Sequence, residues 1–509
     1  MAETTAHVDV LIVGAGLSGI GAAYHLQQKC PDKSFVIFEG RSSMGGTWDL
    51  FRYPGIRSDS DMHTLGYAFK PWEAEKSIAD GPSIREYIRE TAKENRIESH
   101  IRYDHKVVSA EWNSETASWS VTARRTDTGE EIQQSCHFLM MCSGYYNYDG
   151  GYRPRFDGED RFQGQIIHPQ DWDEQTDYDG KKVVVIGSGA TAVTLVPEMA
   201  KKADHVTMLQ RSPTYVVSRP AADRFANRVR KILPRKMAYS LTRWKNVLLQ
   251  RFFFQMARSR PEKVKERMIS MVREELGPDF DVETHFTPKY NPWDQRVCLV
   301  PDSDLFTSIK EGRSSVVTDH IDHFDEHGIN LKSGKHLKAD LVLTATGLDL
   351  VFLGNVQFAV DGRQIIPNEL LNYKGIMYSG MPNLAAVFGY TNASWTLKAD
   401  LSSEFLCRLL KHMDKTDTRI VVPEHSDEDI EYEPWLDFSS GYVQRSLDKF
   451  PKQATTKPWK LNQDYAKDLF ALRFGKLDDG VLKFRSRHSE TAADLSQPPA
   501  RSTNTVPAE

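Results

Sequence analysis

Two segments of the chain combine a short apolar, β-branched run with a glycine-rich turn and an amphipathic stretch. Val8–Val13 predicts a buried strand, which a turn and a helix connect to a second strand over Phe35–Glu39. The same order returns between a strand over Lys182–Ile186 and one over His205–Gln210. A strand, a glycine turn, a helix and a parallel strand form a βαβ unit. The pattern therefore predicts an α/β protein with two Rossmann-like dinucleotide-binding domains.

The rest of the pattern predicts further strands and one long helical region. Apolar or alternating runs predict strands over 107–112, 119–125, 136–142 and 340–346. Residues 223–280 are helical in pattern and basic. Residues 488–509 are rich in Ser, Thr, Pro and Ala, and we expect a disordered tail there.

Composition and charge limit the classes of function. Of the 509 residues, 40% are hydrophobic, which excludes a wholly disordered chain, and the net charge of −5 argues against a nucleic-acid partner. The average hides residues 224–273, which hold fifteen Lys and Arg and only two acids, a local charge of +13. Two interpretations stay open. The segment forms amphipathic helices whose apolar face packs on the core, or it makes peripheral contact with anionic lipid.

The five cysteines are few and widely spaced. They are Cys30, Cys136, Cys142, Cys298 and Cys407. With no Cys-x2-Cys pair among them, we expect neither a disulfide framework nor a metal site. The sequence contains no charged and then apolar leader and no apolar run of about 18 residues. We expect a cytoplasmic protein, associated with the membrane surface if residues 224–273 contact lipid.

The first glycine motif has the pattern of a dinucleotide site. Gly14, Gly16 and Gly19 follow the first strand, and Glu39 ends the second strand. The glycines permit a tight turn, close approach of the backbone to a pyrophosphate, and packing of helix on strand. An acid in the position of Glu39 accepts hydrogen bonds from a ribose diol. A tight turn in an unrelated α/β protein is the alternative.

The second glycine motif differs where it meets the ribose. Gly187, Gly189 and Ala192 form a G-x-G-x-x-A variant that also contains Thr191. The next strand ends in Arg211 and Ser212 instead of an acid. Arginine and serine can bind a 2′-phosphate, which an acid would repel, so the motif predicts a preference for NADPH over NADH. Alternatively, Arg211 is an ordinary solvated surface residue.

Two longer motifs carry a resemblance to a known family. Phe162, Gly164, His168 and Trp172 fall at the spacing F-x-G-x-x-x-H-x-x-x-W. Upstream, Gly45-Gly46-Thr47-Trp48 leads through Tyr53-Pro54-Gly55 to Asp59. With the two glycine motifs, these segments resemble the fingerprints of type I Baeyer–Villiger monooxygenases, and the resemblance extends to about residue 486.

The resemblance implies cofactors and a division into domains. FAD would bind the first glycine motif, because the FAD motif is N-terminal in this family, and NADPH would bind the second. The implied domains are an FAD-binding domain over 1–150 and 336–487, an NADP-binding domain over 151–218 and 286–335, and a basic helical insertion over 219–285.

The resemblance also implies a reaction and two catalytic residues. NADPH would reduce the FAD, and the reduced flavin would trap O2 as a C4a-peroxide that converts a ketone to an ester or lactone and oxidises sulfides as a side activity. Arg296 matches the family's catalytic arginine, and Asp59 matches the acid that positions it. Many relatives carry a Lys before this arginine where Gln295 stands here, which leaves more of the NADPH preference to Arg211. From the residues alone, Arg296 could form an interdomain salt bridge and Asp59 could cap a turn.

Other matched positions are expected around the cofactors. Thr47 and Trp48 would lie near the flavin, with plain core packing as the alternative for Trp48, and Trp395 and Asn392 would line a substrate pocket. The resemblance implies that Phe162, Gly164, His168 and Trp172 couple NADP binding to domain rotation. Pro169 biases His168 towards extended backbone and places this motif on a linker. There, His168 could equally serve a buried hydrogen bond.

Three other classes of protein share parts of this pattern. A flavin disulfide reductase needs two nearby cysteines in the first flavin helix, and Cys30 has no such neighbour. A flavin-containing N- or S-oxygenase resembles the His168 motif but usually lacks the Trp172 position, and it is the nearest alternative. A protein that only holds FAD and NADP would not need Arg296 and Asp59.

Overall fold

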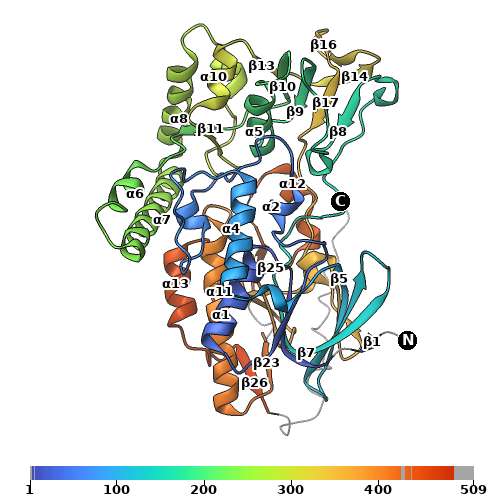
Figure 1. Ribbon diagram of the computed structural model, residues 1–509, viewed down its shortest axis with the longest axis vertical. Helices are drawn as coiled ribbons and strands as arrows, with labels where there is room; N and C mark the ends of the chain where they lie inside the picture. The colour runs from blue at the N-terminus through green and yellow to red at the C-terminus, as the bar shows by residue number, and fades with distance from the viewer. Residues whose placement is uncertain (1–2, 5, 426–429, 437, 487–509) are drawn as a thin grey trace, which may run out of the picture.

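The computed structural model describes residues 3–4, 6–425, 430–436 and 438–486 and contains two large sheets (Figure 1). In this view a ten-stranded sheet forms the lower half and a five-stranded sheet the upper half. The chain begins in the lower sheet, passes through the upper sheet, and returns to the lower one. This arrangement confirms the α/β class with two Rossmann-like units.

Parallel strands form the centre of the first sheet. These are β2 (Val8–Val13), β3 (Phe35–Phe38), β4 (Ile101–Arg102), β7 (Glu131–Met141) and the short β22 (Leu384–Ala386). The antiparallel strands β5 (His105–Asn113) and β6 (Ser118–Arg125) extend the sheet to β18 (Gln357–Val360) and β19 (Arg363–Gln364), and β1 (Glu3–Thr4) pairs with β7. The buried residues 10–13 explain why β2 is central, since a strand buried on both faces must be apolar throughout.

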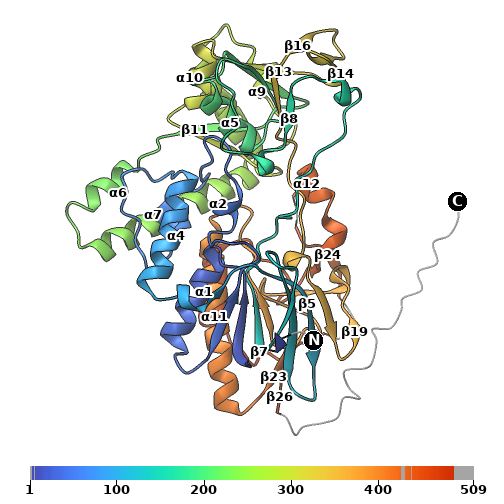
Figure 2. The same ribbon diagram turned by 45° about the vertical axis from the view of Figure 1, so that its right-hand side comes forward.

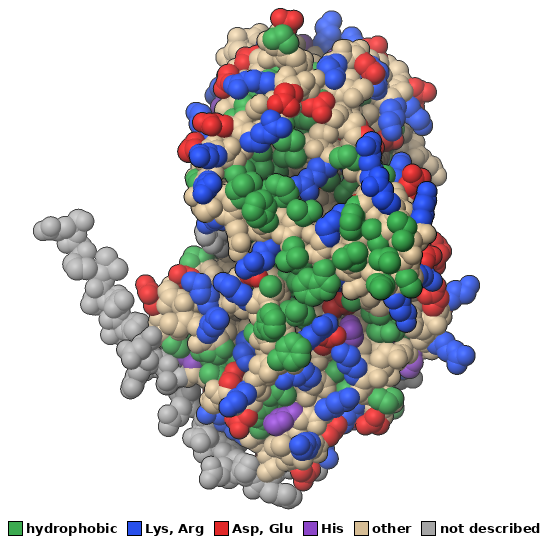
Figure 3. Space-filling view, turned by 90° about the vertical axis from the view of Figure 1, so that its left-hand side faces the viewer, with side chains coloured by type: hydrophobic (Ala, Val, Ile, Leu, Met, Phe, Trp, Pro, Cys, Tyr) green, Lys and Arg blue, Asp and Glu red, His purple; other side chains and the backbone are tan. Residues whose placement is uncertain are grey.

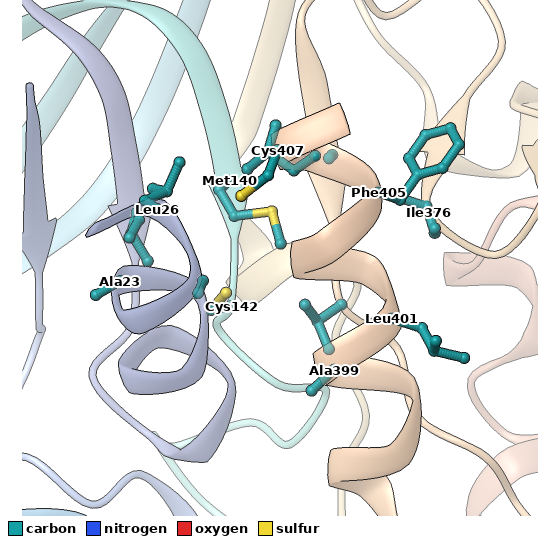
Figure 4. Packing of buried hydrophobic residues seen from close by; sticks show 14 of the residues in the cluster. Ala23, Leu26, Met140, Cys142, Ile376, Ala399, Leu401, Phe405 and Cys407 are labelled. Atoms are coloured by element: carbon teal, nitrogen blue, oxygen red, sulfur yellow. The ribbon is translucent and has the colours of Figure 1, made fainter. Parts of the chain in front are cut away.

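Helices α1 (Leu17–Lys29), α4 (Gly81–Glu94) and α11 (Trp395–Thr416) pack together beside this sheet (Figure 2). Figure 4 shows α1 and α11 side by side next to β7, with Ala23 and Leu26 on one helix and Ala399 and Cys407 on the other. Small side chains at this contact let the two helices approach closely. The N-termini of both helices are thereby fixed at the carboxyl end of the strands.

All strands of the second sheet are parallel. Their order is β13 (Ser314–Thr318), β10 (His205–Gln210), β9 (Lys182–Ile186), β17 (Leu341–Thr344) and β8 (Gln165–Ile167). Helices α5 (Ala190–Met199) and α10 (Asp304–Lys310) pack against one another there, and β14 (Ile321–Asp325), β15 (Gly328–Leu331) and β16 (His336–Lys338) form an antiparallel meander.

Strand membership differs from two expectations. Residues 336–344 were expected in the first domain, but they contain β16, which belongs to the antiparallel meander, and β17, which belongs to the second sheet. β17 pairs with β8 on one side and with β9 on the other, and all four of its residues are buried. The fingerprint from Phe162 to Trp172 is not only a linker, because its residues 165–167 form the edge strand β8.

The basic helices lie between β11 (Val216–Arg219) and β12 (Cys298–Pro301), which pair with one another. They are α6 (Arg224–Val229), α7 (Arg235–Ser259) and α8 (Pro261–Leu276), followed by α9 (Val282–Phe286). Helix α7 packs against α3 (Met62–Leu65) of the first domain, although it interrupts the second domain in sequence. The interpretation that an apolar face packs on the core holds in part, since Tyr239 and Val247 of α7 and Ile269 and Val272 of α8 are buried. Polar Thr242, Arg243 and Asn246 are buried, whereas Leu241 and Leu248 are exposed.

The remaining elements are short. They are α2 (Thr47–Leu50), α12 (Gly441–Gln444), α13 (Tyr465–Arg473), β20 (Asn372–Tyr373), β21 (Met377–Tyr378), β23 (Ile420–Pro423), β24 (Tyr432–Pro434), β25 (Lys452–Ala454) and β26 (Leu482–Arg485). The five cysteines are buried free thiols. Within the described ranges, no helix has the length and apolar character to cross a membrane. The tail expected at 488–509 lies outside the described residues.

Candidate active site

A cavity of about 1640 Å³ extends between the two sheets and reaches both glycine turns. Gly14 and Gly16 line it from the first domain, and Gly187 and Gly189 line it from the second. Arg296 and Asp59 line the same cavity. The structure therefore brings the two nucleotide motifs and the predicted catalytic pair to one space.

The first glycine turn leaves the N-terminus of α1 open to this cavity. Gly14 has a φ of +102°, and a Cβ there would lie 2.7 Å from the carbonyl oxygen of Cys142. Gly19 lies behind the turn, where a Cβ would lie 1.8 Å from the carbonyl oxygen of Gly14, so only glycine lets α1 approach β2 this closely. No side chain caps α1 at Gly16. The first N–H groups of α1 can therefore bind an anion such as a pyrophosphate.

Glu39 is buried beside this turn and lines the cavity. Its carboxylate accepts hydrogen bonds from the backbone N–H groups of Ala15 at 2.7 Å and Arg41 at 3.0 Å. A carboxylate can accept about four hydrogen bonds, so positions remain for two hydroxyl donors. Burial raises the pKa of Glu39, and the two N–H groups oppose that rise. The geometry fits the predicted contact with a ribose diol.

The loop that leads into α2 forms another part of the wall. Thr47 and Trp48, which the resemblance places near the flavin, line the cavity. Asp49 is buried just behind them and pairs with Arg41 at 3.0 Å and Arg52 at 2.7 Å. These ion pairs hold the loop, and with it Thr47 and Trp48, in position at the cavity wall.

The second glycine turn repeats the geometry of the first. Gly187 has a φ of +137°, and a Cβ there would lie 2.3 Å from the carbonyl oxygen of Ala345. A Cβ at Gly189 would meet nothing within 4 Å, which leaves open space in front of α5. Thr191 lines the cavity, and Ala192 is fully buried in the position of the third glycine. No side chain caps α5 at Gly189, so its N–H groups are also available to a phosphate.

Arg211 and Ser212 line the cavity where β10 ends. The neighbouring loop adds a lysine that the sequence analysis did not identify. The N–H group of Asp319 donates to the carbonyl of Gln210, and that of Lys332 donates to the carbonyl of His320, both at 2.9 Å. These two bonds hold Lys332 close to the end of β10, and its side chain lines the same cavity.

Arg296 is held loosely in the cavity wall. Its Nη1 lies 3.6 Å from Oδ2 of Asp59, its Nε 3.5 Å from the Tyr442 hydroxyl, and its Nη2 3.5 Å from the Tyr145 hydroxyl. These neighbours raise the pKa of Arg296, Tyr442 most of all, and burial opposes them. The contacts are long for hydrogen bonds. Three of the five N–H donors of the guanidinium make these long contacts, so the other two remain for a ligand.

Aromatic residues cover the cavity near Arg296. Trp395 stacks on Tyr145 with ring centroids 5.2 Å apart, and its Nε1 donates to Oγ of Ser18 at 2.8 Å. Trp395 lines the cavity, whereas Asn392, which the resemblance also placed in a substrate pocket, does not. Its side-chain amide donates to the backbone carbonyl of Gln463 at 2.9 Å, which turns it away from the cavity.

The fingerprint residues lie outside the cavity and connect the domains. His168 accepts a hydrogen bond at Nδ1 from the N–H group of Gln170 at 3.2 Å, and its Nε2 donates to the carbonyl of Gly347 at 3.1 Å. Burial lowers the pKa of His168. Phe162 and Trp172 are buried, and a Cβ at Gly164 would lie 2.4 Å from the carbonyl oxygen of Asp340. All four residues thus pack where the chain enters and leaves the second sheet.

A family model described as flavin-binding monooxygenase-like matches residues 76–414, and one for an NAD(P)-binding Rossmann-like domain matches residues 12–73. The FAD-containing monooxygenase EthA of Mycobacterium tuberculosis (strain H37Rv) is 53% identical over 484 residues, which cover 95% of this chain and 99% of that protein. The chain belongs to the flavin-binding monooxygenase-like family.

Other members and solved structures agree with this assignment. The probable FAD-binding monooxygenase AlmA of Acinetobacter baylyi is 46% identical over 495 residues, covering 97% of this chain and 99% of that protein. A steroid monooxygenase bound to NADP has the same fold, with a TM-score of 0.75 at 22% identity over 94% of this chain and all of that one. The open crystal structure of cyclohexanone monooxygenase also has this fold, with a TM-score of 0.74 at 19% identity. The match covers 95% of this chain and 100% of that one. The comparisons confirm a flavin monooxygenase and support FAD and NADPH as its cofactors.

The site fits the cofactors of the flavin-binding monooxygenase-like family. Each glycine turn presents an uncapped helix N-terminus to the cavity, and Glu39 offers unused acceptors beside the first turn. Among the described residues, no group of three or more His, Cys, Asp or Glu side chains could hold a metal ion. Sequence reasoning missed Lys332 and Tyr442, because neither belongs to a motif, and the fold alone brings them to the cavity.

Proposed function

We propose that this flavin monooxygenase uses NADPH and O2 to convert ketones to esters or lactones, and that it also oxidises thioethers. The observation that supports this reaction most is Arg296, a permanent cation with unused donors inside a cavity that joins both nucleotide turns. When bound and reduced by NADPH, FAD supplies the activated oxygen.

The protein's own residues then have separate tasks. Arg296 donates hydrogen bonds to the oxygen of the ketone, where negative charge develops during the reaction. Asp59 positions the guanidinium from 3.6 Å. Trp395 and Tyr145 exclude water from the reacting atoms, which strengthens this electrostatic interaction.

NADPH is bound by the second domain. The N-terminus of α5 takes the pyrophosphate, and Arg211, Ser212 and Lys332 take the 2′-phosphate. Gln295 also lines the cavity but carries no charge. Lys332 therefore supplies a second cation at the phosphate.

A test compares ester and sulfoxide formation in the FAD-loaded enzyme. Arg296→Ala should keep its FAD and lower the rate of ester formation by about 10²–10³-fold, the effect of removing one charge-stabilising donor. Arg267→Ala, at an exposed arginine of α8, is the matched control and should keep full activity. Ester formation at the wild-type rate in Arg296→Ala would refute the role of Arg296.

The same experiment tests the alternative, an N- or S-oxygenase that acts mainly on heteroatoms. A thioether has no carbonyl oxygen on which charge must be stabilised. If the wild-type enzyme forms sulfoxides but no ester from a panel of linear, cyclic and aryl ketones, the heteroatom oxygenase is correct and the Baeyer–Villiger assignment fails.

A further inference from the structure

Helix α7 buries several polar side chains and leaves several large apolar ones exposed. Thr242, Arg243 and Asn246 are buried beside Tyr239 and Val247, whereas Leu248 is 55% exposed and Phe252 57% exposed. On an ordinary amphipathic helix the large apolar residues face the core and the polar ones face water. The buried polar residues of α7 therefore need partners inside, and its exposed apolar residues are available to a partner outside.

The inner face is polar because it binds exposed backbone groups of the first domain. Nη1 of Arg243 donates to the carbonyls of His63 at 2.9 Å and Gly66 at 2.7 Å, where the short helix α3 ends. The side-chain amide of Asn246 donates to the carboxylate of Asp61 at 2.8 Å. Since buried backbone carbonyls need donors, these polar residues are required on the inner side of α7, and several of its large apolar residues lie on the outer side.

The outer face of α7 is a continuous stripe. Met237, Leu241, Trp244, Leu248 and Phe252 are all exposed and recur every three or four residues, so they line one side of the 25-residue helix. Phe225 of α6 and Ile232, which is 74% exposed, extend it. Single exposed apolar residues are ordinary, but a contiguous apolar stripe marks an interaction surface.

Basic residues surround this stripe. Arg224, Arg228, Lys231 and Lys236 are exposed, and within the described part of the chain no acid lies within 4.0 Å of their charged nitrogens. Figure 3 views the side of the molecule that carries α6 and α7 in Figure 1, and it shows hydrophobic side chains gathered across the middle with Lys and Arg between and around them. We call this surface, formed by the stripe, Phe225, Ile232 and the four basic residues, the α6–α7 face.

We propose that the α6–α7 face docks on an anionic lipid surface. Apolar side chains of an in-plane helix insert at the boundary between headgroups and acyl chains, and the flanking Lys and Arg bind anionic headgroups. A second copy of the chain is a poor occupant. A symmetric pair would bring two segments of charge +13 together, and like charges facing one another oppose association.

Co-sedimentation of the FAD-loaded full chain with vesicles tests this docking without turnover, so its outcome is independent of the proposed reaction. The enzyme should bind vesicles of phosphatidylcholine with 30% phosphatidylglycerol and not vesicles of phosphatidylcholine alone. Raising the salt concentration should weaken the binding, because the headgroup attraction is screened. Failure to bind the anionic vesicles at low salt would overturn the proposal.

Two variants separate the apolar and basic contributions. L241Q/L248Q/F252Q removes the centre of the stripe, and R228Q/K231Q/K236Q removes three charges. Each should lower the lipid partition coefficient at least about tenfold. The matched controls are I366Q, at an apolar residue that is 50% exposed elsewhere, and K310Q/K335Q/K338Q, which removes the same charge from the second domain. An equal loss in the controls would overturn the proposal.

A second measurement locates the contact on α7. Brominated acyl chains should quench part of the tryptophan fluorescence, and this quenching should disappear in Trp244→Phe, because Trp244 belongs to the stripe. Quenching unchanged in this variant would overturn the placement. Light scattering measures the oligomeric state. If the wild type is a dimer that L241Q/L248Q/F252Q dissociates, and neither protein binds lipid, the α6–α7 face binds a second copy of the chain and the proposal fails.

Discussion

Two arginines show how the surroundings of one residue type decide its task. Arg243 is buried, and its Nη1 donates to three backbone carbonyls, those of His63, Thr64 and Gly66. Arg296 has only contacts of 3.5–3.6 Å. Nη1 of Arg243 thus serves the fold. Arg296 makes only long contacts and keeps two of its five N–H donors for a ligand, which is what a catalytic cation requires.

At the same scale, we predict that two cations determine the preference for NADPH. Lys332→Ala and Arg211→Ala should each raise the NADPH KM about tenfold or more, since a hydrogen bond to a charged group contributes about 1.5–3 kcal/mol. The NADH KM should change little, because NADH has no 2′-phosphate. Steady-state kinetics with both coenzymes measure this selectivity. Equal increases for both coenzymes in Lys332→Ala would remove that lysine from the phosphate site.

Site residues that belong to a sequence motif could be predicted, and those outside a motif could not. Glu39 was predicted from its spacing after Gly19 because a βαβ unit fixes that geometry. Lys332 could not be predicted, since its place follows from backbone bonds between a loop and the end of β10. The direction of the Asn392 side chain could not be predicted, because a side chain in a turn can face either way. In the structure its amide donates to the carbonyl of Gln463.

At the scale of elements, α7 is the instructive case. Its helical period was visible in the sequence, but the direction of its faces was not. Polar residues take part of its inner face because the end of α3 presents carbonyls to which donors such as Arg243 bind. The strands were easier to predict, since β2, β9 and β10 are apolar runs whose burial leaves only one interpretation.

We predict that Arg243 contributes more to stability than any exposed base of α7. Arg243→Met keeps roughly the volume of the side chain but removes its charge and its donors. The buried carboxylate of Asp400, 3.5 Å from Nη2, loses this cation, and the carbonyls at the end of α3 lose this donor. Removing one partner of a buried ion pair costs about 3–5 kcal/mol.

Thermal unfolding followed by flavin fluorescence should therefore show a Tm several degrees lower in Arg243→Met. Lys245→Met is the control. It breaks the more exposed pair with Asp223 on the same helix, and such pairs contribute about 0–1 kcal/mol. A Tm for Arg243→Met equal to that of the control would show that α7 is held by other contacts.

At the scale of the whole molecule, function depends on how two nucleotide-binding domains are joined. The chain crosses between them near His168 and again near Gly347, and the imidazole bonds the two crossings together at 3.1 Å. The family fingerprint therefore lies at a junction between the two domains, and its four named residues do not line the cavity. The spacing of the fingerprint could be recognised in the sequence. The partner Gly347 could not, because that contact joins segments far apart in the chain.

This junction should weaken as the pH falls. Burial lowers the pKa of His168 below its ordinary value of about 6.5. The unfolded chain then binds a proton near pH 6.5 that the folded protein does not, so the stabilisation is complete above this pH and is lost as the pH falls through and below it. Protonation also removes the Nδ1 acceptor that the N–H group of Gln170 uses.

We therefore predict that the Tm of the wild-type protein falls between pH 7.5 and 5.5 more steeply than that of His168→Gln, whose amide can still donate to the Gly347 carbonyl but does not titrate. In the described part of the chain, three other histidines also have lowered pKa values, His63, His137 and His285. Only the difference between the two proteins therefore reports on His168. His285→Gln serves as the control for a half-buried histidine away from the junction. Parallel Tm curves for the wild type and His168→Gln would show that His168 does not make the junction sensitive to pH.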